Sequence, residues 1–91
     1  MKNTALIVID AQKYFLTDET KPIVKRIQEF LRGKFDQYDV TYFTIFRNDS
    51  NSPLWLLSKW RDCTGSPDTD ICDEIKEFAN KKNTFYKNIY K

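Results

Sequence analysis

Asp10 is the first residue in the chain whose type and position could do chemistry. It directly follows an apolar run at residues 5–9, Ala-Leu-Ile-Val-Ile. A continuous run of this kind is typical of a parallel-sheet strand that is buried on both faces. A carboxylate at the end of such a strand lies at the edge where open α/β sheets bind ligands. There Asp10 could act as a general base, a metal ligand or a ribose binder, or it could simply close the strand as a turn residue.

Lys87 is the second candidate, because it follows the β-forming residues 84–86. If that segment is a parallel strand, Lys87 lies at the same edge of the sheet as Asp10. A lysine beside a carboxylate can stabilise an anionic nucleophile or a developing oxyanion. The alternative interpretation is an ordinary surface lysine, since Lys87 begins a lysine-containing tail over residues 87–91.

Three further polar residues follow the ends of predicted strands. Gln12 could hold Asp10 through a side-chain hydrogen bond, or it could bond the loop backbone. Arg47 and Asn48 follow a β-forming stretch at residues 40–46 and are candidate substrate contacts. A solvated turn is the competing interpretation for both of them.

Several classes of mechanism are excluded by residues that the chain lacks. It has no histidine, so it cannot by itself build a Ser-His, Cys-His or His-metal site. Its two glycines, Gly33 and Gly65, are too few for a dinucleotide fingerprint or a P-loop, and we expect no cofactor. Cys63 and Cys72 lack the C-x-x-C spacing, and we predict that they are packing residues rather than a disulfide or metal pair.

The elements that must position these residues follow from the hydrophobic pattern. We predict a strand over residues 4–10, a helix over 21–32, where apolar residues recur at helical spacing after Pro22, and a strand over 40–46. This order predicts a βαβ unit with parallel strands and a right-handed crossover. Residues 53–60 predict a short apolar helix or a packed loop.

The remaining segments complete the same pattern. A loop over residues 62–68 precedes a predicted helix that presents Ile71, Ile75, Phe78 and Ala79 on one face. Residues 84–86 predict a short third strand. The fold class is therefore α/β: the first half of a doubly wound, mostly parallel sheet with helices on its faces and three strands present.

Composition limits the partners and the compartment. The 91 residues are 41% hydrophobic and carry a formal net charge of +2, so we expect one small globular domain over residues 1–91 and no nucleic-acid partner. No apolar stretch has the length of a membrane span, and the N-terminus does not resemble a signal peptide. We therefore expect no membrane association and a cytoplasmic location.

Three blocks of the sequence together resemble the isochorismatase-like cysteine hydrolases, which include nicotinamidases and related amidohydrolases. Residues 5–15 (ALIVIDAQKYF) are similar to the apolar strand of that family that ends in D-x-Q-x-x-F. Residues 60–71 (WRDCTGSPDTDI) resemble the loop with a Gly-Ser pair before a helix. Residues 85–90 (FYKNIY) are similar to the segment that holds the family's lysine, and the order of the blocks fits along the whole chain.

The resemblance implies an Asp-Lys-Cys triad, in which Asp10 matches the aspartate and Lys87 the lysine. The aspartate takes the thiol proton, and the thiolate then attacks an amide-type carbonyl to give a thioester. Relatives that act on isochorismate cleave a vinyl ether instead. The nicotinamidase branch carries metal-binding histidines after its second strand, where this chain has none at residues 46–52, so we expect no metal.

The chain departs from the family at the nucleophile. The family's cysteine follows the lysine in the second half of the fold, and neither Cys63 nor Cys72 matches it. We interpret residues 1–91 as the N-terminal portion of one such domain, truncated or split, and expect it to be inactive alone. Its expected partners are a small amide-type substrate, once completed, and either further copies of itself or a complementing second chain.

The alternative is a non-catalytic α/β module that acts through self-association or a partner chain. In the family's strand order the first strand is central. The interpretation therefore predicts that residues 5–9 form an open edge, with an apolar patch beside it.

Overall fold

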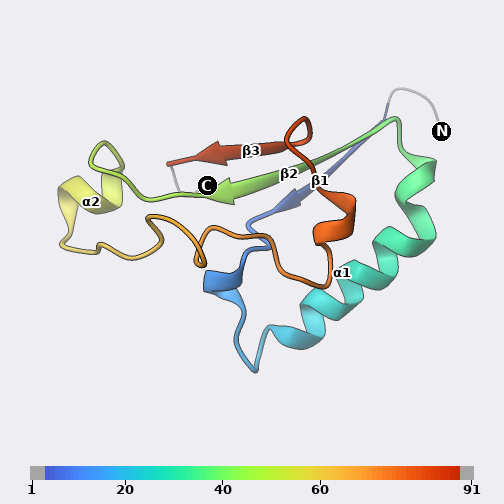
Figure 1. The fold of residues 1–91 in the computed structure, drawn as a ribbon, viewed down its shortest axis with the longest axis horizontal. Helices are drawn as coiled ribbons and strands as arrows, with labels where there is room; N and C mark the ends of the chain where they lie inside the picture. Colours follow the sequence, from blue (N-terminus) through green and yellow to red (C-terminus); the bar gives the residue numbers. More distant parts are fainter. Residues whose placement is uncertain (1–3, 89–91) are drawn as a thin grey trace.

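The computed structural model describes residues 4–88, which form a parallel α/β fold (Figure 1). Its three-stranded sheet has the order β1-β2-β3, with β1 at Ala5–Ile9, β2 at Val40–Phe46 and β3 at Thr84–Lys87. Both β1 and β3 pair in parallel with the central β2. The predicted α/β class, strand positions and parallel pairing are confirmed. The last residues of the lysine tail and of the third matched block, 89–91, lie outside the described part.

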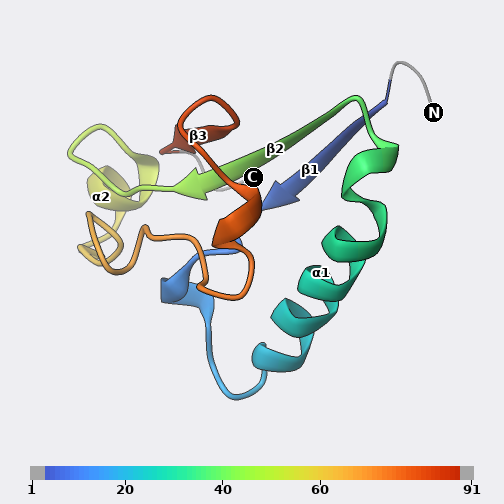
Figure 2. The same cartoon turned by 45° about the vertical axis from the view of Figure 1, so that its right-hand side comes forward.

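Helix α1, Lys21–Lys34, covers one face of the sheet (Figures 1 and 2). Pro22 fits the first turn, where a missing N–H costs no helical hydrogen bond. The helix buries Val24 and Leu31 against Val8 and Phe43 of the sheet. Burial of this apolar stripe, rather than helix propensity alone, holds the helix in place.

The second face of the sheet has no helix over it among residues 4–88. Side chains alternate along β1, so Val8 is buried towards α1 while Ile7 and Ile9 point the other way and are exposed. The prediction that the apolar run 5–9 is buried on both faces is therefore wrong for this chain. The physical reason is that a parallel strand is buried twice only where helices lie on both sides of the sheet.

The predicted helix after residue 69 does not form. Residue Ile71 instead makes an isolated antiparallel bridge with Gln12, and the Cys72 amide donates to the Ala11 carbonyl at 3.1 Å. This pairing holds the chain extended where the helix was expected to begin. Only a 3₁₀ turn, Lys76–Phe78, follows, although Ile75 still packs in the core.

The connection after β2 contains a second helix, α2, at Pro53–Leu57, which agrees with the predicted short apolar helix. It lies beyond the carboxyl end of β2 (Figure 1). Leu56 and Leu57 on this helix are exposed. Across residues 4–88, no helix is both long and apolar enough to cross a membrane.

Candidate functional site

Asp10 occupies the turn that ends β1, and its backbone has the left-handed conformation, with φ of 57°. Its amide donates to the Thr44 carbonyl of β2 at 2.9 Å, which keeps the residue attached to the sheet. Aspartate is one of the few non-glycine residues that visit this region regularly, at a modest energetic cost. The turn places the carboxylate at the carboxyl end of the sheet rather than on one of its faces.

Lys87 and Asp10 form an ion pair at this end of the sheet. The Lys87 Nζ lies 3.1 Å from Asp10 Oδ1 and donates a hydrogen bond to Asp10 Oδ2 at 3.3 Å. Their side chains are 25% and 16% exposed. The two residues end β3 and β1, which flank β2, so the predicted juxtaposition at one edge is confirmed. Their catalytic role stays a prediction.

One oxygen of the Asp10 carboxylate is left without a hydrogen bond. Oδ1 is buried, and its contact with Lys87 is close enough for an ion pair but lacks hydrogen-bond geometry. Buried carboxylate oxygens normally accept at least one hydrogen bond. The Oδ1 atom could therefore accept a proton or hydrogen bond from a further donor brought to this edge.

The two charged groups do not share one depression, which corrects a further expectation. Lys87 lines a polar hollow together with Arg47, Asp49 and Tyr86. Asp10 lines a separate, mainly apolar cavity with residues that include Phe15. The ion pair thus lies on the wall between a polar and an apolar compartment.

Gln12 adopts the second of its two predicted roles, since it bonds backbone rather than Asp10. The side chain is 1% exposed. Its Nε2 donates to the Phe46 carbonyl at 2.8 Å and to the Asp68 carbonyl at 3.2 Å. Its Oε1 accepts from the Phe46 amide at 2.8 Å. Gln12 therefore joins the segment after Asp10 to the end of β2 and to the loop before Asp70.

Asn48 is also an internal residue. Its Nδ2 donates to the carbonyls of Trp60 and Asp62, at 3.0 and 3.1 Å, and its Oδ1 accepts from the Ser52 hydroxyl. It closes the loop that follows β2. Whether Asn48 or Gln12 also contacts a substrate stays a prediction, and their burial favours a positioning role.

Arg47 is exposed beside the polar hollow, and its guanidinium stacks over the Tyr86 ring at 4.7 Å. Its amide donates to the Lys87 carbonyl at 2.8 Å. Tyr86 and Asp49 are two neighbours of the site that the sequence analysis missed. The pairing of Ile45 with Tyr86 places Tyr86 there, and no local motif signals such a register.

Both cysteines are free and buried, which agrees with their prediction as packing residues. Burial, with a smaller contribution from the Asp68 carboxylate, raises the pKa of Cys63 to about 11. Burial likewise raises the pKa of Cys72. A thiol is nucleophilic only as its thiolate, so neither cysteine has the environment of a nucleophile. Among residues 4–88, no group of three or more His, Cys, Asp or Glu side chains could hold a metal ion.

Comparison with known proteins agrees with the fold. The structure is similar to the crystal structure of an isochorismatase-like hydrolase from Alkaliphilus metalliredigens, with a TM-score of 0.58 and 17% sequence identity. The similarity covers 92% of this chain and 51% of that chain, so the chain spans about half the length of the protein it matches. No family model matches the sequence. No curated protein matches it either. The likeness supports an N-terminal portion of that fold.

Proposed function

We propose that this chain supplies the aspartate and lysine of an isochorismatase-like cysteine hydrolase that cleaves an amide or a related C–N bond. The nucleophilic cysteine comes from polypeptide outside these 91 residues. The observation that carries the proposal is the partly buried ion pair of Asp10 and Lys87 at the carboxyl edge of the sheet. Its companion is the buried Asp10 Oδ1, which has room to accept a donor.

In the proposed reaction Asp10 takes the proton of the incoming thiol. The Lys87 ammonium stabilises the resulting thiolate, which attacks the carbonyl carbon of the substrate. The C–N bond breaks, the nitrogen leaves with the proton held by Asp10, and a thioester remains. Water then hydrolyses the thioester and regenerates the thiol.

The neighbouring residues support this chemistry in two ways. Gln12 and Asn48 act as positioning residues, because their amides bond the backbone around the turn after β1 and the loop after β2. Arg47 is the residue we propose to contact the substrate, since its guanidinium borders the polar hollow that Lys87 also lines. An exposed guanidinium suits a polar or anionic group of the substrate.

The test is reconstitution. The 91-residue chain is co-expressed with the polypeptide that lies beside it in its source genome, and hydrolysis of a panel of small amides is measured for each chain alone and for the pair. We expect turnover only by the pair. We expect it to fall on the order of 100-fold or more in Asp10→Asn and in Lys87→Met, since positioned acid–base groups contribute about that much. Asp36→Asn, an exposed aspartate away from the edge, is the matched control.

Two outcomes would contradict the proposal. Turnover by the purified chain alone, lost in Asp10→Asn, would mean that no external thiol is needed. Turnover by the pair that is unchanged in Asp10→Asn would remove Asp10 from the mechanism. A neighbouring polypeptide without any activity-conferring cysteine would favour the non-catalytic module instead.

A further inference from the structure

The outer edge of β1 offers unpaired backbone groups. The Asp10 amide bonds to Thr44 of β2, and successive residues of a strand direct their N–H and C=O groups to opposite sides. The N–H and C=O groups of Ala5, Ile7 and Ile9 therefore point away from β2. Within the described residues, β1 pairs with no other strand. Such an edge is a template for a further strand unless a proline or a charge blocks it, and β1 has neither.

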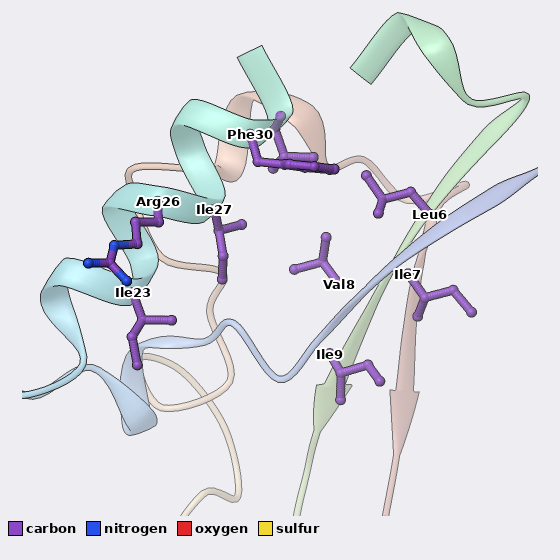
Figure 3. A pocket seen from close by; sticks show the side chains of 9 residues that line it. Leu6, Ile7, Val8, Ile9, Ile23, Arg26, Ile27 and Phe30 are labelled. Carbon is purple, nitrogen blue, oxygen red and sulfur yellow. The ribbon is translucent and has the colours of Figure 1, made fainter. Parts of the chain in front are cut away.

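An apolar groove runs beside this edge. It has a volume of about 340 Å³ and lies between β1 and α1 (Figure 3). Figure 3 shows Ile27 and Phe30 extending from α1 towards β1. Ile7 is 54% exposed, Ile9 60%, Ile23 54% and Phe30 44%. An apolar patch of this kind next to an open strand edge marks an interaction surface.

We propose that a second copy of this chain occupies the surface, with the two β1 strands paired antiparallel about a two-fold axis at Ile7. The outward-directed residues 5, 7 and 9 are symmetric about Ile7. The axis therefore pairs Ile7 with itself and Ala5 with Ile9, and each pair exchanges two hydrogen bonds. The edge is self-complementary, which is what an isologous interface requires.

The helices fit the same symmetry. Helix α1 connects two parallel strands, so it runs opposite to β1, with Phe30 near the Leu6 end of the groove and Ile23 near the Ile9 end (Figure 3). The two-fold axis brings Ile23 of each copy towards Phe30 of the other. Arg26, the one charged residue lining the groove, lies one turn from Glu29, and the axis brings each towards the opposite charge. Both three-stranded sheets then continue into one another.

The test is the oligomeric state of the full chain by sedimentation equilibrium across a wide concentration range. We expect a dimer. We expect Ile7→Lys to weaken dimerisation at least 100-fold, because it places two ammonium groups at the axis. Leu57→Lys is the matched control, since Leu57 is 88% exposed on α2, away from β1, and should leave the dimer unchanged. Circular dichroism shows whether each variant is folded.

A positive measurement complements the loss of dimer. In Ile7→Cys the two introduced thiols face one another across the axis, and a short thiol-reactive cross-linker should join them, whereas Cys63 and Cys72 are buried. Leu57→Cys should not cross-link. A compact monomer at high concentration would overturn the proposal, as would a dimer that persists in Ile7→Lys, failure of Ile7→Cys to cross-link, or a different polypeptide bound at the β1 edge.

Discussion

Removal of the Gln12 side chain is the most direct test of how the site is held together. In Gln12→Ala, three protein contacts of one buried amide disappear: those to the Phe46 carbonyl, the Phe46 amide and the Asp68 carbonyl. The alanine cannot replace them, and water has little access because the side chain is 1% exposed. The turn after Asp10 thereby loses its connection to β2.

The expected loss of stability can be worked from these contacts. A buried backbone group that loses its partner costs about 1–3 kcal/mol. With the two contacts to Phe46 dominant, and a cavity left by the removed side chain, we expect the free energy of unfolding to fall by about 3–5 kcal/mol. A domain of this length has a total stability of roughly 5–14 kcal/mol. The variant should therefore lose a large fraction of it.

Urea unfolding followed by circular dichroism measures this loss. With a slope of about 1–3 kcal/mol per M, the midpoint should fall by about 2 M. Gln37→Ala is the matched control, because Gln37 is exposed in the 3₁₀ turn Phe35–Gln37 and should change stability by no more than about 0.5 kcal/mol. A loss below about 1 kcal/mol in Gln12→Ala would refute the positioning role derived from its hydrogen bonds.

Two further predictions concern the charged and sulfur groups. A double-mutant cycle of Asp10→Asn and Lys87→Met, measured by urea unfolding, should give a coupling of about 1 kcal/mol for the partly buried pair, and a value near zero would contradict a formed ion pair. The pKa of Cys63 is raised from its ordinary 9.0 to about 11, so the thiol should alkylate about 100-fold more slowly at pH 8 in the folded chain than in urea. Because the folded pKa lies above the unfolded one, the stabilisation from Cys63 is present below pH 9 and is lost as the pH rises to about 11. Cys63→Ala should reduce that loss in the urea midpoint, and an identical pH dependence in both proteins would contradict it.

Local pattern was sufficient for the elements that carry their own signal. The β-forming residues of β2 and the helical apolar spacing of α1 predicted both elements, and β2 forms over the predicted residues. The βαβ order then required parallel strands with their carboxyl ends together. That geometric rule placed Asp10 and Lys87 at one edge from the sequence.

Tertiary contacts decided what the pattern could not. The pairing of Gln12 with Ile71 overrode the helical spacing after residue 69, because an extended backbone paired with a neighbour cannot begin a helix. The burial of Gln12 depends on backbone groups 34 and 56 residues away, which no local window contains.

The sequence by itself determined that residues 5–9 form a strand and that Asp10 ends it, since apolar periodicity and chain order are local properties. Only the tertiary structure decided that Ile7 and Ile9 are exposed. Burial depends on which elements lie over the second face of the sheet, and in residues 4–88 α1 covers one face alone. The same run of residues is a core strand or an open edge according to what packs against it.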